Sequence, residues 1–381
     1  MYQYKIALHA ASQIEGYDER VNLLPWHPRR LDDEILSSWM LSIASGNGIS
    51  VRRLCAWLGS DDRVREIDSM KPYNPLVNHI AEAAGVEKDI VIKSLPTGLY
   101  GLFGKSISST DWSWTSNTQW RLLGGTPPNN LGNQYCPICL RKFGHYQLSW
   151  TIAVYSCCLQ HKCFLRDHCP HCGKRFLGAA RFFDSCIAKP KRDLQLCAYC
   201  GRSVVNHERY ELADEKTLKL TYMLDSLVRK PACVDYFKVL ARLLHVMCRP
   251  SALAKHMRSQ MLPSSHQITS RYWSGTPPEF EYLDVKSRAF MLQAVVSLFA
   301  DWPDYLVDVL RSTNDLHHLH HLFKNKSLPN WYESAVRIAA TRNRCPKPSD
   351  REQFLHAAIQ QGWVTAVQFA KKLVILGVFF I

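Results

Sequence analysis

Four closely spaced pairs of metal-binding residue types lie between residues 136 and 200. The first pair is Cys136 and Cys139 in CPIC, and the second is Cys158 and His161 in CLQH. Two donors separated by two residues fit on one tight turn, so both can point at the same ion. The spacing C-x2-C-x18-C-x2-H lies within the range of a four-ligand zinc site, with bonds of ~2.3 Å to sulfur and ~2.0 Å to nitrogen.

Two further pairs continue this pattern. CPHCGKRF contains Cys169 and Cys172, and LCAYCGRS contains Cys197 and Cys200. Both stretches place a glycine after the second cysteine, where it lets the backbone amides turn toward the sulfurs. The repetition predicts two zinc ions, each held by four protein ligands. A site without an open position binds no substrate, so the metal is predicted to be structural.

The distribution of the donors between two ions is left open by the spacing. We expect sequential pairing of the first four donors and of the last four, and an interleaved, cross-braced arrangement is the alternative. Disulfides, a redox centre and iron–sulfur ligation are the rival interpretations, but a regular knuckle with a histidine favours zinc. Four neighbouring residues could replace a ligand: Cys157, Cys163, His168 and His171. The remaining cysteines are predicted to be buried small hydrophobic residues or inert thiols: Cys55, Cys186, Cys233, Cys248 and Cys345.

No pattern in the sequence indicates catalysis. The stretch HHLHHLF at 317–323 has no cysteine or carboxylate partner, which favours a solvated basic face over a metal site at His317–His321. GLYGLFGKS at 98–106 misses the phosphate-binding loop pattern, because Leu99 stands where the first glycine belongs. No G-x-S-x-G elbow is present. The chain is therefore predicted not to be an enzyme, and a zinc-supported nuclease is the weaker alternative.

The charge balance favours a polyanionic partner. The formal net charge is +14, and residues 135–210 contribute twelve Lys or Arg against four Asp or Glu. A basic surface of this kind attracts nucleic acid. Five residues are predicted to contact nucleic-acid phosphates or acidic partner surfaces, with solvated charges as the alternative: Arg141, Lys142, Lys174, Arg175 and Arg202.

The sequence also bears on the compartment. No apolar run reaches the ~18 residues of a membrane-spanning helix, and the N-terminus lacks the order of a secretory signal. We therefore expect a cytoplasmic protein without a membrane partner.

Helical periodicity precedes the cysteine pairs. LDDEILSSWMLSIASGNG predicts a helix from Leu31, with Asp32 and Asp33 at its positive end and a stop at the GNG turn. Ser50 is predicted to cap a second helix over 51–58. The following stretch PLVNHIAEAAGVEKDIVIKSL, with its turn at Gly-Val, is typical of a helix-turn-helix unit, with a plain helical hairpin as the alternative.

The rest of the chain completes the predicted architecture. Residues 96–134 are expected to form an irregular connection, and residues 144–156 a short strand pair. Helical patterns return over 211–230, 235–248 and 286–302. The fold is therefore predicted to be mainly α with small β. It divides into an N-terminal helix-turn-helix domain with its linker (1–134), a tandem zinc-ribbon or knuckle module (135–210) and a C-terminal α-helical domain (211–381).

Three stretches together span residues 22–205. They are LLPWHPRRLDDEILSSWMLSIASGNGISVRRLCAWL, then YCPICLRKFGHYQLSWTIAVYSCCLQHKCFLRDHCPHCGKRF, and finally LCAYCGRSV. In this order they resemble the TniQ family of transposon target-selection proteins. The resemblance implies a non-catalytic adaptor that holds one structural Zn2+ on Cys136, Cys139, Cys158 and His161. It implies a second structural Zn2+ on Cys169, Cys172, Cys197 and Cys200.

The resemblance also implies partners. TniQ proteins bridge a target-recognising module and the transposition machinery. By resemblance, this chain is expected to be a bacterial, nucleoid-associated protein that links a Cascade effector with its guide RNA to the AAA+ ATPase TnsC. It is also expected to contact the backbone of target DNA. Some relatives act as homodimers, so a homodimer is possible here. A TnsD-type protein that reads an attachment site without a guide RNA is the alternative. The tail GWVTAVQFAKKLVILGVFF starts like another helix-turn-helix unit without its recognition helix, which favours the Cascade-borne role.

Overall fold

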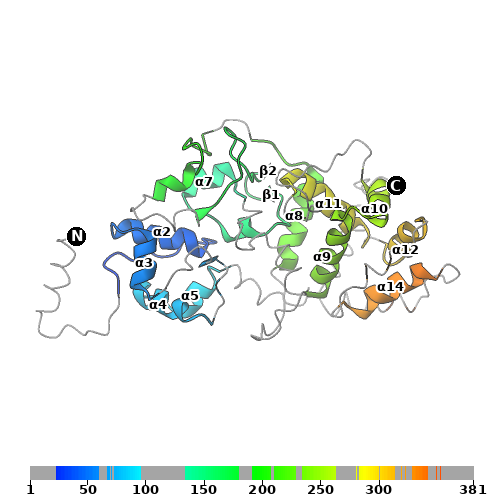
Figure 1. Ribbon diagram of the computed structural model, residues 1–381, viewed down its shortest axis with the longest axis horizontal. Helices are drawn as coiled ribbons and strands as arrows, with labels where there is room; N and C mark the ends of the chain where they lie inside the picture. Colours follow the sequence, from blue (N-terminus) through cyan, green and yellow to red (C-terminus); the bar gives the residue numbers. More distant parts are fainter. Residues whose placement is uncertain are drawn as a thin grey trace, which may run out of the picture.

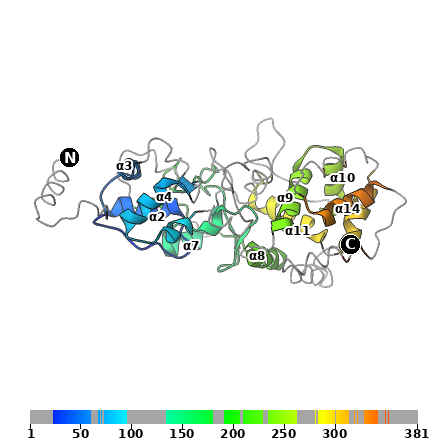
Figure 2. The same ribbon diagram turned by 90° about the horizontal axis from the view of Figure 1, so that it is seen from below.

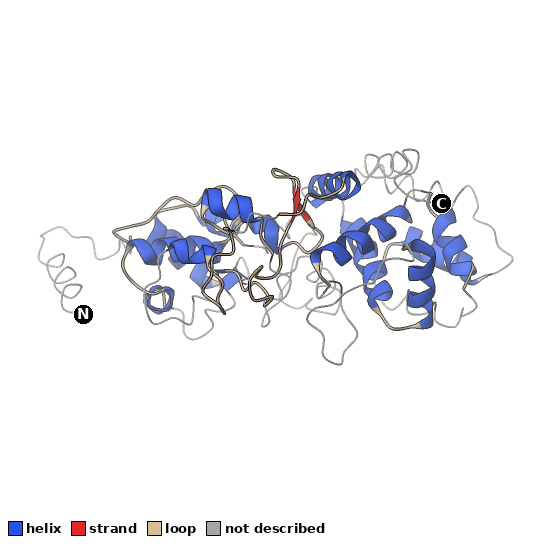
Figure 3. Cartoon of the chain, turned by 90° about the horizontal axis from the view of Figure 1, so that it is seen from above, coloured by secondary structure: helices blue, strands red, loops and turns tan. Residues whose placement is uncertain are grey.

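The described helices form two groups on either side of a cysteine-rich segment (Figure 1). Views from below and from above show the same order along the long axis of the molecule (Figures 2 and 3). The computed structural model describes residues 23–59, 67–68, 70, 73–95, 134–179, 191–206, 210–228, 234–262, 280, 283–299, 301–313, 319, 322, 328–341, 349 and 352. We call residues 134–179 and 191–206 the cysteine-rich module.

Helices dominate the described part of the chain. The first group contains α2 (Leu36–Gly46), α3 (Val51–Trp57), α4 (Pro75–Ala84) and α5 (Lys88–Ile92). The cysteine-rich module contains α7 (Pro137–Phe143), the 3-10 turns η3 (Leu148–Thr151) and η5 (Lys191–Gln195), and the antiparallel strands β1 (Cys157–Cys158) and β2 (Cys163–Phe164). The second group contains α8 (Glu215–Val228), α9 (Val234–Cys248), α10 (Ala252–Met261), α11 (Val285–Ser297), α12 (Asp304–Arg311) and α14 (Asn330–Ala340). The prediction of a mainly α structure with a small β component is confirmed.

The first helix begins later than the sequence suggests. α2 starts at Leu36 rather than Leu31, and Asp33 has a left-handed backbone with φ of 56°. The prediction that Asp32 and Asp33 lie at the positive end of this helix is therefore wrong. Asp33 instead accepts hydrogen bonds from Leu148 and Ser149 of the cysteine-rich module.

The end of α2 and the start of α3 lie where predicted. α2 ends at Gly46, and the Asn47 side chain donates to the carbonyls of Trp26 and Ile43. Any side chain at Gly46 would collide with the Trp26 indole, because a Cβ atom there would lie 1.8 Å from its Cδ1. The Ser50 side chain accepts a hydrogen bond from the backbone of α3, which confirms the predicted cap.

The predicted helix-turn-helix stretch contains two helices of unequal length. α4 has ten residues and α5 has five, and Gly85 between them has a left-handed backbone with φ of 61°. α4 buries its apolar face, including Val77 and Ile80, whereas the start of α5 exposes charged side chains. The structure therefore contains the helical hairpin, and a DNA-reading role for it stays a prediction.

The strand pair predicted over residues 144–156 is wrong. This stretch contains the 3-10 turn η3 and no strand pair, and the backbone around Tyr146 and Leu148 bonds to the segment that leads into α2. Ile35 N–H donates to the Tyr146 carbonyl, and Leu148 N–H donates to the Asp33 carbonyl. The aromatic residues that suggested strands, including Tyr146 and Trp150, are buried where the module meets α2.

The second helical group has an aromatic core. The three helical patterns predicted after residue 210 correspond to α8, α9 and α11, and α12 packs against α14. The Trp302 ring centroid lies 5.4 Å from Phe299, 5.0 Å from Trp331 and 6.2 Å from Tyr332. The His317–His321 cluster, the 98–106 loop, the C-terminal tail and Cys186, Cys233 and Cys345 lie outside the described residues.

None of the described helices combines the length and the apolar character that crossing a bilayer requires.

Candidate metal centres

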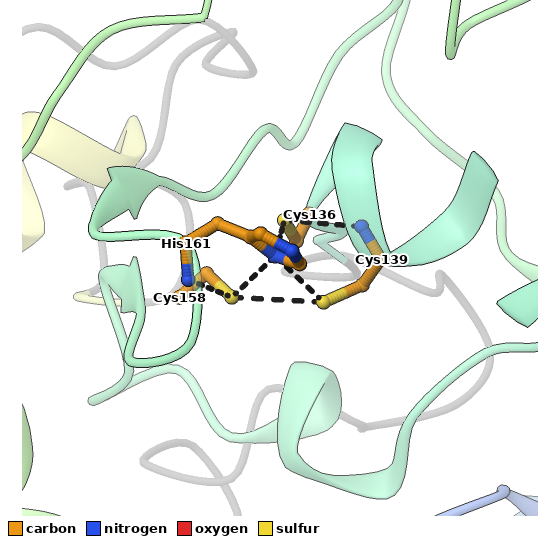
Figure 4. A group of neighbouring side chains, drawn as sticks. All are labelled: Cys136, Cys139, Cys158 and His161. Carbon is orange, nitrogen blue, oxygen red and sulfur yellow. Dashed lines mark hydrogen bonds between the residues drawn. The ribbon is translucent and has the colours of Figure 1, made fainter. Parts of the chain in front are cut away.

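Four donor atoms from two knuckles meet at the first site (Figure 4). Cys136 and Cys139 stand at the start of α7, Cys158 ends β1, and His161 lies on the turn to β2. The Sγ atoms of Cys139 and Cys158 are 3.7 Å apart. His161 Nδ1 lies 3.5, 3.2 and 3.5 Å from the three sulfurs in chain order. An ion with ~2.3 Å bonds to sulfur separates tetrahedrally placed sulfurs by about 3.8 Å, so the donors fit one tetrahedral ion.

The second site gathers four sulfurs. Cys169 Sγ lies 3.8 Å from Cys200 Sγ, and Cys172 Sγ lies 3.7 Å from Cys197 Sγ. All four sulfurs lie within 4.8 Å of one another. The two groups of donors are those of the sequential pairing, not of the interleaved one. The structure thus brings together all eight residues that the sequence predicts as ligands, and their metal binding stays a prediction.

Each knuckle directs a backbone N–H toward its first sulfur. A thiolate accepts such bonds readily, because they spread its negative charge, and they orient a metal ligand before the metal binds. The four donor–acceptor distances are all 3.4 Å: Cys139 N to Cys136 Sγ, His161 N to Cys158 Sγ, His171 N to Cys169 Sγ and Tyr199 N to Cys197 Sγ.

The thiols of the first site compete for ionisation when no cation is present. Hydrogen bonding from Cys139, and further from Cys158 and Cys163, lowers the pKa of Cys136. The same contact with Cys136 raises the pKa of Cys139. A divalent cation removes this conflict, because it favours the thiolate form of every coordinating cysteine. Three thiolates and an imidazole are a donor set typical of zinc, although the identity of the metal stays a prediction.

A residue with a left-handed backbone follows three of the knuckles. Gly173 (φ 68°) and Gly201 (φ 67°) occupy this position in the second site, and Lys162 (φ 51°) occupies it in the first. The N–H of each donates to the carbonyl of the cysteine four residues earlier, over 3.0, 3.0 and 2.8 Å respectively. Lys162 thus adopts a conformation that favours glycine.

All four alternative donors lie outside both groups, and three of them have other partners. His168 Nδ1 is 2.7 Å from a carboxylate oxygen of Asp167, and His171 Nε2 is 3.0 Å from the Ser203 carbonyl. The Cys157 thiol donates to Thr221 Oγ1 over 3.1 Å. The fourth, Cys163, lies against Cys136, with their sulfurs 3.8 Å apart.

Two of the other cysteines are buried, away from both groups of donors. Cys55 and Cys248 are buried, as predicted. Burial raises the pKa of Cys55 to about 12, so its thiol stays protonated near neutral pH.

The cysteine-rich module is joined to the first helical group by polar contacts that are partly or fully buried. The Asp33 carboxylate accepts from the Ser149 hydroxyl over 2.6 Å. Tyr146 N–H donates to the Ser38 hydroxyl, and the Tyr146 hydroxyl donates to the Leu194 carbonyl over 2.7 Å. Tyr146 therefore connects α2 with η5, which leads into the last knuckle.

A buried charge network joins the module to the second helical group. Arg288 on α11 is fully buried (0% exposed), and its Nη2 lies 2.9 Å from Gln134 Oε1 and 3.8 Å from Asp167 Oδ2. Gln134 in turn donates to the carbonyls of Ile152 and Tyr155. Although burial raises the pKa of Asp167, the hydrogen bond to His168 and the charge of Arg288 lower it below its usual value.

Sequence analysis missed this network. Gln134 and Arg288 are 154 positions apart, so no local spacing links them. The available signal was an arginine within KSRAFMLQAVVS, a stretch that is apolar on most sides. A charge in such a helix needs a partner in the core.

The predicted contact residues lie at the surface of the module. Arg141 and Lys142 occupy the last turn of α7 and are exposed, as are Lys174 and Arg202, whereas Arg175 is half-buried. Lys174 Nζ lies 4.7 Å from the centroid of the exposed Tyr199 ring. Basic and aromatic side chains thus share the surface of the second site.

The fold and the two sites define a mainly helical protein organised around two groups of tetrahedrally placed metal donors. Residues 25–165 match the model of the TniQ family. The match includes every donor of the first site and none of the second. It supports the TniQ family for this stretch, a family of transposition-associated adaptors and target selectors. No curated protein matches the chain.

Proposed function

We propose that this protein is a non-catalytic adaptor of transposition. It links a Cascade effector, held by its guide RNA at target DNA, to the AAA+ ATPase TnsC and so to the transposase. The match of residues 25–165 to the TniQ family carries the proposal. In it, Zn2+ occupies both sites as a structural ion and takes no part in a reaction.

The contacts around the first site support a role in holding two surfaces apart. Asp33 and Ser149 join the module to one helical group, and Asp167 and Arg288 join it to the other. An adaptor must present one binding surface to each partner in a fixed relation, because flexibility between them would cost ordering entropy on assembly. A partly buried polar contact on one side and a buried one on the other supply that rigidity.

The helical hairpin supports an adaptor over a TnsD-like direct reader. The described start of α5 exposes Glu87, Lys88 and Asp89, and Glu82 is exposed at the end of α4. A recognition helix in the major groove needs donors and positive charge facing the phosphates. Lys93 at the end of α5 is exposed as well, so the hairpin exposes three acidic side chains and two lysines, a near balance that does not supply the positive surface a DNA reader needs.

The basic surface of the module supplies the contact with nucleic acid. Arg141 and Lys142 extend from the negative end of α7, and Lys174 and Arg202 flank Tyr199 on the second site. Contacts from such side chains to phosphates position a protein on the duplex without reading its sequence. Binding to DNA by the isolated chain is therefore expected to be weak and sensitive to salt.

The test is assembly from purified components. The zinc-loaded chain should bind guide-loaded Cascade in size-exclusion chromatography, and TnsC should join the complex only when the chain is present. In DNA binding by the isolated chain, Arg141→Ala/Lys142→Ala should reduce the slope of log K against log salt by about 1 to 2. Lys88→Ala, an exposed lysine outside the module, is the matched control and should leave the slope unchanged.

Two results would redirect the proposal. Tight binding by the isolated chain to one DNA sequence, without a guide RNA, would replace the adaptor with a direct target reader. Absence of any association with Cascade or TnsC would exclude the adaptor role.

A further inference from the structure

A fifth thiol lies against the first metal site. The Sγ atom of Cys163 is 3.8 Å from that of Cys136, and the Cys163 side chain is fully buried (0% exposed). This separation equals the sulfur–sulfur edge of about 3.8 Å that a tetrahedral ion with ~2.3 Å bonds produces. One ion could bond to both of these sulfurs, but Cys163 lies outside the group of donor atoms that are all within 4.8 Å of one another, so its thiol must turn to join them.

The backbone holds Cys163 beside the site from two directions. It lies on β2 directly opposite Cys158, which is itself one of the donors. On its other side it forms an isolated bridge with Leu212. With the Cα position fixed in this way, a turn about the first side-chain torsion is enough to redirect the thiol.

His161 is the donor that leaves the first site most readily. It is partly exposed, whereas the three cysteines of the group are buried. It stands on the turn between β1 and β2, next to Lys162 with its left-handed backbone. Release of a cysteine would open the core of the module, but release of the histidine only frees a surface turn.

We propose that Cys163 is a reserve ligand of the first site. It takes the place of His161, so that the ion is held by the sulfurs of Cys136, Cys139, Cys158 and Cys163. In this exchange the bond from His161 Nδ1 to the ion breaks, a bond from Cys163 Sγ forms, and the thiol proton passes to the freed imidazole. No electron is transferred. Four thiolates are a common ligand set for structural zinc. The inference rests on the metal site alone and does not depend on the role in transposition.

The test follows metal retention in the full-length chain, with Zn2+ and Co2+ as the probes. His161→Ala should keep two ions per chain, with a loss of first-site affinity below about tenfold. Its Co2+ form should show stronger sulfur-to-metal charge-transfer absorption than the natural protein, because a fourth thiolate joins the first site. His161→Ala/Cys163→Ala should bind the first ion at least about 100-fold more weakly.

The matched control removes a neighbouring thiol that faces away from the site. Cys157 is buried one residue before Cys158, and its thiol contacts Thr221 on α8. His161→Ala/Cys157→Ala should therefore retain two ions, as the single variant does. The four-cysteine second site serves as an internal reference in each sample.

Equal loss of the first ion from His161→Ala and from His161→Ala/Cys163→Ala would overturn the proposal. Unchanged charge-transfer absorption in Co2+-loaded His161→Ala would overturn it as well. If circular dichroism shows that His161→Ala does not fold, His161→Phe fills the space of the ring without a nitrogen donor, and the same pairwise comparison with Cys163→Ala applies.

Discussion

The two metal sites use nearly the same ligand chemistry in different surroundings. In the first, Cys136 and Cys139 are 0% and 1% exposed and belong to a core that is continuous with both helical groups. In the second, one cysteine of each knuckle is buried, while Cys172 and Cys200 are exposed. From this difference we expect an ion at the first site to complete a core at the junction of the two helical groups, and an ion at the second site to shape a peripheral surface that carries basic side chains.

The largest difference should appear when one ligand is removed from each site. Cys139→Ser should abolish the cooperative unfolding transition, because binding of a structural zinc contributes about 10–16 kcal/mol, comparable to the whole stability of a domain. Cys172→Ser should reduce the zinc content from two ions to one and leave the helical signal nearly unchanged. Circular dichroism with elemental analysis of purified protein measures both effects.

Two results would contradict this difference between the sites. If Cys172→Ser unfolds the protein as completely as Cys139→Ser does, the second site is as integral to the core as the first. If neither variant changes the unfolding transition, neither site has the structural role that we assign to it.

The second prediction concerns the charge network between the module and α11. Arg288→Met should lower the free energy of unfolding by about 3–5 kcal/mol, because it leaves the Asp167 carboxylate buried without its cationic partner. The double variant Arg288→Met/Asp167→Leu should recover part of this loss, since it leaves no uncompensated charge. Denaturant unfolding at fixed free zinc, in the form of a double-mutant cycle, gives the coupling.

The pH dependence of the same network has a definite sign. The folded-state pKa of Asp167 is lowered, so the stabilisation from its charge is present above the unfolded pKa of about 3.9 and is lost as the pH falls through the folded-state value. The advantage of the natural protein over Asp167→Asn should therefore be present at pH 7 and shrink in acid. An advantage that grows in acid would contradict the lowered pKa.

The sequence predicted the donors better than the elements that position them. Cysteine spacing predicts which donor atoms lie together, because a knuckle is local and two donors on one turn have little freedom. The strand pair expected over 144–156 failed for the opposite reason. Tyr146 and Trp150 are residue types that favour strands, but the backbone of Tyr146 bonds to Ile35 and Ser38 at the start of α2, more than a hundred residues earlier in the chain, and Trp150 N–H donates to the Gln147 carbonyl within a 3-10 turn.

The same distinction explains the error at Asp33. Asp33 stands directly before a stretch with the apolar periodicity of a helix, so the sequence alone cannot distinguish it from a helix cap. Its actual partner, Ser149, is 116 positions away. Contacts of this kind depend on tertiary structure, which single-sequence patterns do not encode.

The third prediction tests the other junction of the first site. Ser149→Ala removes the hydroxyl that donates to the Asp33 carboxylate, and it should lower the free energy of unfolding by about 1–2 kcal/mol, since hydrogen bonds to charged groups are stronger than neutral ones. Ser226→Ala is the control, because that hydroxyl donates only to a carbonyl of its own helix, α8, and should cost less. An equal effect of both substitutions would show that Asp33 does not stabilise the junction.

The smallest predicted effect exchanges the residues that follow equivalent knuckles. Lys162→Gly relieves a left-handed backbone, which costs a non-glycine residue about 1–2 kcal/mol. The greater freedom of glycine in the unfolded chain offsets about half of this benefit. We therefore expect the free energy of unfolding to rise by about 0.5 kcal/mol. Gly173→Lys makes the reverse change in the second site. A Cβ at Gly173 meets no atom within 4 Å, so its cost should come from the backbone alone, about 0.5 kcal/mol after the same offset. Denaturant unfolding of the zinc-loaded variants measures both. A loss of stability in Lys162→Gly would mean that the lysine side chain itself stabilises the first site. The two knuckles would then differ in their side-chain contacts and not in backbone strain.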